Sequence, residues 1–337
     1  MTTLLALLIS IAAAILPTAL YAAAFYWADR HEREPKWLVS VAFLWGAIPA
    51  IIVSLVAEIA FGAAFISQPG TLGAAVVESA VAAPIIEELA KGFAIWLIYL
   101  FFRREFDGVL DGLIYGALVG FGFAMTENFF YFIGAFDEGG FASLSVVIVL
   151  RAVIFGLNHA LYTGLTGLGF GLARESKSPR ARRLWPLFGL ALATLVHSLH
   201  NLGASLTEVN GLAILLSLGL AVLGFGLILV TYLLSLRREK HLIRRELADE
   251  VGILLTERDY SILSGQVPGR RRSAYTGEQK QLINLYAKLA FSKHRLRAYG
   301  PDGHPKTLAE IDLLRVRIQE VTTSVTATGT TTSTPQG

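Results

Sequence analysis

The chain has 337 residues, of which 54% are hydrophobic and only 16% are charged, and its mean hydropathy is +0.55. Soluble domains carry about a quarter charged residues, so the composition argues against a single globular enzyme in water. The sequence contains no cysteine, which excludes disulfides, iron–sulfur clusters, thiol nucleophiles and cysteine-ligated zinc. Any metal must therefore be held by His, Glu, Asp or Asn.

Seven segments are long and apolar enough to cross a bilayer, which takes about 20 mainly apolar residues of helix. They lie at 3–28, 37–61, 73–102, 111–136, 144–173, 185–205 and 211–236. The first segment lacks the basic start and the cleavage pattern of a signal peptide, so we expect it to remain as a helix. The predicted fold is an all-α polytopic membrane protein with about seven transmembrane helices, formed by residues 1–236.

Only alternate loops of this predicted membrane domain contain Lys or Arg residues. They are present in the loops near 29–36, 103–104 and 174–183 and at the start of the tail, at 237–240. The loops near 62–72, 137–143 and 206–210 contain neither residue. Because short cytoplasmic loops are enriched in Lys and Arg, we predict a cell-membrane protein with its N-terminus outside and its C-terminal tail in the cytoplasm.

The C-terminal tail differs in charge from the rest of the chain. Residues 1–236 hold 12 Lys and Arg against 15 Asp and Glu, whereas residues 237–337 hold 17 against 11. Residues 237–320 show helical patterns, and the Thr/Ser-rich residues 321–337 are predicted to be disordered. The basic residues near 237–245 and 270–272 suit either a solvated face or contact with anionic lipid headgroups. We predict no nucleic-acid partner.

Ionisable residues within the apolar segments are the most informative feature, because a charge at mid-bilayer costs roughly 2.5–3.5 kcal/mol even on insertion scales. Glu58, Glu78 and Arg151 lie toward the outer ends of their segments, where snorkelling to the interface explains them. Deeper polar residues need another explanation. These are Glu87, Glu88, Lys91, Glu127, Asn128, Asn158, His159, His197, His200 and Asn201.

Four of the deeper residues share one depth. Counted from the cytoplasmic ends of their segments, Glu88, Glu127, His159 and His197 lie 13 to 17 residues in, which places them within roughly 6 Å of each other along the membrane normal. Each residue alone is explained by an ion pair or an interhelical hydrogen bond. Together they predict a single buried site.

Spacing within each segment adds detail to this site. Lys91 follows Glu87 by four residues and Glu88 by three, so it can neutralise either carboxylate on one helix face. His197 and Asn201 are one turn apart, which allows imidazole and carboxamide to hold one ligand or one water. Phe123 precedes Glu127 by one turn and is placed to shield it from water.

Such a group of residues favours hydrolysis. Two His residues and carboxylates can hold zinc with a position open for water, and a remaining Glu is then the general base. Alternatively, Glu and His activate water without a metal, and Asn201 stabilises the oxyanion. The sequence has no H-E-x-x-H motif and no G-x-S-x-G motif. Ser198 diverges from His197 by about 100° around the helix, which argues against a Ser–His pair.

Several motifs resemble those of a known family, the PrsW intramembrane proteases, which are related to the CAAX prenyl-protease and bacteriocin-processing superfamily. They are Glu87-Glu88-x-x-Lys91, Phe123-x-x-x-Glu127 within its flanking sequence, His159-Ala-Leu-Tyr-Thr-Gly and the later His197 motif. The resemblance covers roughly residues 20–236 and does not extend to the tail. The superfamily's usual Arg after the Glu pair and His in the second motif are replaced here by Lys91 and Glu127, which counts against prenyl-protein processing.

The resemblance implies a peptidase that cleaves membrane-protein substrates, a class that includes anti-sigma factors. The residues expected to act in catalysis are Glu87, Glu88, Lys91, Glu127 and Asn201. The expected ligands of a zinc ion are Glu127, His159, His197 and His200.

Two functions of other classes fit the same residues. A secondary transporter or proton-coupled channel also uses intramembrane Glu and His residues, and Pro84 is a candidate for the helix break common in transporters. No internal repeat relates the two halves of the chain, however, and an odd number of segments fits a duplication poorly. A non-catalytic scaffold is the third alternative, and it predicts that the intramembrane polar residues are replaceable.

Overall fold

The computed structural model describes residues 2–28, 34–66, 70–103, 105–207, 209–267, 275–303 and 307–330. Within these ranges the chain forms helices without a β-strand, apart from one isolated bridge between Val251 and Leu255. The predicted all-α class is therefore confirmed. The chain divides into two compact units, residues 1–29 with 33–232 and residues 30–32 with 233–337.

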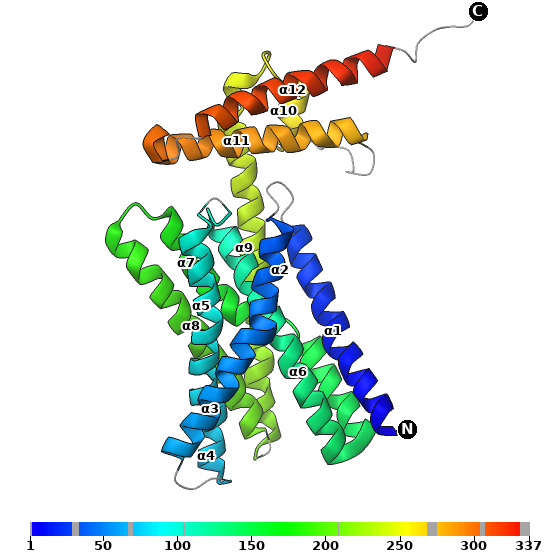
Figure 1. Cartoon of the computed structure of the whole chain (residues 1–337), viewed down its shortest axis with the longest axis vertical. Coiled ribbons are helices and arrows are strands. Elements are labelled where there is room, and N and C mark those ends of the chain that lie inside the picture. The colour runs from blue at the N-terminus through cyan, green and yellow to red at the C-terminus, as the bar shows by residue number, and fades with distance from the viewer. Residues whose placement is uncertain are drawn as a thin grey trace, which may run out of the picture. The chain divides into compact units, whose positions relative to one another are not determined.

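The first unit is a bundle of long helices (Figure 1). In chain order these are α1 (Thr2–Ala28), α2 (Lys36–Trp45), η1 (Gly46–Ala50), α3 (Ile51–Phe65), α4 (Leu72–Val77), η2 (Glu78–Ala82), α5 (Ala83–Phe101), α6 (Val109–Ile148), η3 (Val149–Ile154), α7 (Asn158–Glu175), α8 (Pro179–Leu206), η4 (Gly211–Ala213) and α9 (Ile214–Glu246). Helix α6 packs against α1, α2 and α7, and α7 also packs against α5 and α8. The division between the two units falls within α9.

Five described stretches are long and apolar enough to cross a membrane: Thr2–Trp27, Lys36–Phe65, Val109–Glu175, Pro179–Leu206 and Gly211–Glu246. The third contains 67 residues and includes a break at Gly139 and Gly140, where Gly140 adopts a φ of +64°. Glycine accepts this left-handed conformation at little cost. The chain turns back after this break, since Arg151, which follows the break in the sequence, contacts Glu127, which precedes it.

Local sequence features determine where the helices that carry the polar residues begin and where they change geometry. The Asp111 carboxylate accepts the backbone N–H groups of Asp107 and Gly108, at 2.8 and 2.7 Å, and so caps the start of α6. The segments η2 and η3 are π-helical, a widened geometry often found at functional sites. The first lies one turn before the Glu pair, and the second carries Arg151.

Closely packed glycines fix α6 against α7. Gly112, Gly116 and Gly120 repeat every fourth residue on one face of α6. A Cβ atom at Gly120 would overlap the carbonyl oxygen of His159, and one at Gly116 would overlap that of Thr163. Small residues at this spacing allow two membrane helices to approach at backbone distance. The backbones of His159 and Thr163 are thereby held against α6.

The second unit has its own core. It contains the end of α9, η5 (Ala248–Glu250), α10 (Glu257–Leu263), α11 (Gly277–Gly303) and α12 (Thr307–Thr330). Ile243, Leu247, Leu289 and Ile318 are among its buried residues. Helix α12 continues past residue 320 to Thr330, into the segment for which disorder is predicted. Residues 331–337 and the basic residues 270–272 lie outside the described residues.

Candidate functional site

Helix α5 presents two carboxylates and one ammonium group to the interior of the first unit. Lys91 Nζ lies 3.0 Å from Oε2 of Glu87 and 2.7 Å from Oε1 of Glu88, the contacts that the spacing predicts. The side chains of Lys91 and Glu88 are fully buried. Removing charges from water is costly unless they are paired, and the two carboxylates here leave one negative charge uncompensated by Lys91. The group therefore favours a further cation.

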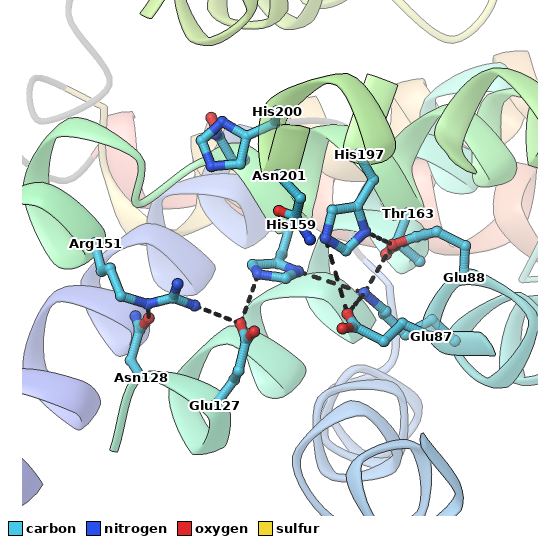
Figure 2. Close-up of polar contacts among 12 residues, drawn as sticks. Glu87, Glu88, Glu127, Asn128, Arg151, His159, Thr163, His197, His200 and Asn201 are labelled. Atoms are coloured by element: carbon cyan, nitrogen blue, oxygen red, sulfur yellow. Dashed lines mark hydrogen bonds and ion pairs between the residues drawn. The ribbon is translucent and has the colours of Figure 1, made fainter. Parts of the chain in front are cut away.

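Helices α7 and α8 add two side chains that hold Glu88. His197 Nδ1 lies 3.1 Å from Oε1 of Glu88, and Thr163 donates from Oγ1 to the other carboxylate oxygen at 3.2 Å. The ring of Tyr162 stacks on His197, with centroids 4.5 Å apart and planes 17° apart. Both oxygens of Glu88 are thus engaged by neighbouring side chains (Figure 2).

His159 has a different partner on each side of its ring. Its Nδ1 atom lies 3.4 Å from Lys91 Nζ, and its Nε2 atom lies 2.8 Å from Oε2 of Glu127. Phe123 closes the space beside it, with its ring centroid 5.5 Å from that of His159 and 3.9 Å from Lys91 Nζ. Phe123 therefore covers Lys91 and His159.

One donor atom from each of Glu87, Glu88, His159 and His197 lies within 4.8 Å of the other three, and all four residues are buried. Imidazole nitrogens and carboxylate oxygens are the ligands that zinc takes in catalytic sites free of cysteine. The Lys91 ammonium already lies among these donors, so the pocket accepts positive charge. The donor set fits a divalent metal ion.

Arg151 lies within the site region, contrary to the expectation that it snorkels to the interface. Its Nη2 atom lies 2.6 Å from Oε2 of Glu127, and its Nε atom donates to Oδ1 of Asn128 at 2.8 Å. The guanidinium group also lies 3.7 Å from the centroid of the Tyr131 ring. The sequence did contain an indication of this role, since an Arg within an apolar segment needs an anionic partner.

His200 and Asn201, both predicted as site residues, have partners outside the four-residue group. His200 Nδ1 lies 3.2 Å from Nδ2 of Asn158, and its ring packs on Phe155 with centroids 4.8 Å apart. Asn201 donates from Nδ2 to the carbonyl oxygen of Ser79 in η2, at 2.8 Å. Figure 2 shows both on α8 beside His197, with His200 turned away from the Glu pair. Glu127 contacts His159 and is also outside the four-residue group.

Comparison with known proteins agrees with this arrangement. A family model described as the PrsW family intramembrane metalloprotease matches residues 34–233. The chain is 30% identical to Protease PrsW of Geobacillus kaustophilus over 178 residues, which cover 53% of this chain and 72% of the relative. It is 30% identical to Protease PrsW of Bacillus subtilis over 191 residues, 57% of this chain and 80% of that protein.

A third relative, Protease PrsW of Oceanobacillus iheyensis, is 28% identical over 58% of this chain and 82% of its own length. No solved structure matches the chain. The matched region contains the Glu pair, both buried His residues and Arg151, and it ends at residue 233, where the main part of the second unit begins. The family assignment favours the peptidase over the transporter and the scaffold, and the chain belongs to the PrsW family of intramembrane metalloproteases.

Proposed function

We propose that this enzyme cleaves membrane-protein substrates at a zinc site held by Glu88, His159 and His197, with Glu87 as the general base. The observation that carries the proposal is the convergence of these four buried donor groups within 4.8 Å. Two His and one Glu form a common ligand set of catalytic zinc, which keeps one position open for water. This set replaces Glu127 and His200 of the sequence-based ligand prediction with Glu88.

The different surroundings of the two carboxylates support their separate roles. Glu88 is held by Lys91, His197 and Thr163, as expected of a ligand whose position must be fixed. Glu87 contacts Lys91 and lies 4.0 Å from Nε2 of His197, which is too far for a direct hydrogen bond. Glu87 therefore retains the freedom to accept a proton and release it.

The residues then perform the steps of peptide hydrolysis. A bound zinc ion would supply Lewis acidity, lowering the pKa of water and polarising the scissile carbonyl. Glu87 accepts the proton of the attacking water and delivers it to the departing amine. Lys91 donates to both carboxylates and limits the repulsion between them. Phe123 covers this region and helps to exclude bulk water.

The proposal extends to topology and substrate. Helical residues 72–101 contain Glu78, Glu87, Glu88 and Lys91, and the break at Gly139–Gly140 divides the Val109–Glu175 stretch. If residues 72–101 count as one crossing and the Val109–Glu175 stretch counts as two, the five stretches become seven crossings. The basic loops support an outside N-terminus and a cytoplasmic tail. We keep the division into a membrane domain and a basic helical tail, in which the helix now extends to Thr330. The basic residues of the tail either face solvent or contact anionic lipid headgroups. The resemblance to PrsW supports substrates of the anti-sigma-factor class.

Two matched variants test the proposed roles of the carboxylates. Zinc in the purified wild-type enzyme, Glu87→Gln and Glu88→Gln is measured beside cleavage of a single-span transmembrane reporter with a fluorophore–quencher pair. We expect stoichiometric zinc in wild type and Glu87→Gln, loss of zinc in Glu88→Gln, and loss of cleavage in both variants. Active wild-type enzyme without zinc would overturn the zinc site and leave metal-free water activation. Cleavage by Glu87→Gln at the wild-type rate would remove Glu87 from the mechanism.

A further inference from the structure

We propose that Arg151 is a positioning residue that acts through Glu127 to orient His159 toward the metal. This inference rests on the proposed function, because it concerns how one zinc ligand of that site is held. Arg151, Glu127 and His159 come from η3, α6 and α7, and they form a continuous series of contacts of 2.6 and 2.8 Å.

The two nitrogens of His159 show which side faces the metal. A neutral imidazole carries a proton on one nitrogen and a lone pair on the other. Nε2 lies against the Glu127 carboxylate, which accepts a hydrogen bond from it, so the lone pair is on Nδ1. Nδ1 is the nitrogen that faces Lys91 within the four-residue group. Glu127 thus contacts the side of the ring opposite to the metal donors.

Metal-binding His residues commonly donate their second N–H group to a carboxylate, which fixes the tautomer and the ring orientation. Glu127 occupies that place for His159. The same oxygen, Oε2, accepts from His159 Nε2 and from Arg151 Nη2. These contacts engage Glu127 away from the metal, so it acts as the support of a ligand.

Arg151 is itself fixed by three groups on one helix. Its guanidinium bonds to Glu127 and Asn128 and lies over the ring of Tyr131, and all three residues are on α6. Arginine forms such multiple planar contacts, which a single ammonium reproduces only in part. The π-helical turn η3 places Arg151 opposite this face of α6. Asn128 and Tyr131 therefore determine where Arg151 holds Glu127.

The test measures zinc affinity, by competition with a chelator in detergent, and separately kcat and KM for the transmembrane reporter. Loss of such a supporting contact typically weakens metal affinity or activity 10- to 100-fold. We expect this loss in Arg151→Met and Glu127→Ala, with kcat lowered and KM unchanged, and partial recovery in Arg151→Lys. The double variant Arg151→Met/Glu127→Ala should bind zinc no more weakly than Glu127→Ala alone, because both residues act on the metal site through the contact of Glu127 with His159.

Arg174→Met is the matched control. Arg174 on α7 bonds to the carbonyl oxygen of Phe106 at 2.9 Å and lies 4.0 Å from the Tyr99 ring centroid, so its loss also removes a partly buried arginine. We expect this variant to lose stability and to keep zinc affinity.

Normal zinc affinity and kcat in folded Arg151→Met would overturn the inference alone. A double variant whose fold-loss of zinc affinity equals the product of the two single fold-losses would also overturn it. Absence of zinc from the wild-type enzyme would overturn the proposed function, and this inference with it.

Discussion

His197 Nδ1 lies 3.1 Å from Oε1 of Glu88, although the two residues are 109 positions apart in the sequence. This contact joins α8 to α5 at a fully buried carboxylate. His200, one turn further along α8, instead contacts Asn158. The two His residues therefore differ in environment although they share a helix.

His197→Ala and His200→Ala form a matched pair that tests this difference. We expect His197→Ala to lose zinc, because one of the three proposed ligands is removed, and His200→Ala to retain it. Metal analysis of both purified variants beside wild type provides the measurement. Equal loss of zinc from both variants would contradict the assignment of His197, and not His200, as a zinc ligand.

The glycine contacts between α6 and α7 predict a strong dependence on one methyl group. In Gly120→Ala the new methyl group would meet the carbonyl oxygen of His159, and overpacking of this kind typically costs about 1–3 kcal/mol. At Gly134, also on α6, a methyl group would enter open space, because beyond the adjoining residues and backbone of α6 itself no atom of the described residues lies within 4 Å. We expect a lower Tm in detergent for Gly120→Ala than for Gly134→Ala, and equal Tm values would refute the close approach.

Lys91→Met should make stability depend strongly on zinc. Lys91 contacts both Glu87 and Glu88, and removing one partner of a buried ion pair typically costs 3–5 kcal/mol. A metal that binds the folded state restores stability by mass action. We therefore expect a larger rise in Tm on adding zinc to the chelated variant than to chelated wild type. A variant as stable as wild type without zinc would contradict this charge balance.

The second unit should lose stability in acid through Glu250. Burial raises the pKa of Glu250, but hydrogen bonds from Arg315 and Lys293 outweigh burial and hold this pKa below its ordinary value of 4.5. A carboxyl group whose pKa is lowered by folding stabilises the fold above its unfolded pKa, and this contribution disappears as pH falls through the folded pKa. Acidification below about pH 4.5 should therefore loosen α11 and α12.

Hydrogen exchange in α11 and α12 of the full chain, corrected for the intrinsic effect of pH, measures this change. Glu250→Gln should already exchange faster at neutral pH and should respond less to acid. Glu320→Gln, a change at an exposed carboxylate of α12, is the control and should behave as wild type. An unchanged acid response in Glu250→Gln would exclude Glu250 as its source.

The sequence by itself determined the helical class, the membrane-spanning character and the contacts of Lys91 with Glu87 and Glu88. These follow from hydropathy and from spacing within one helix, where the rise of 1.5 Å per residue also gives the depth of a residue. The rotation of each helix about its axis is set by packing between helices, and tertiary structure alone decided it. For that reason the sequence predicted His200 as a ligand beside His197 and placed Arg151 at the interface. In the structure, the close packing of α6 with α7 and the π-helical turn η3 bring His159 and Arg151 to the same oxygen of Glu127.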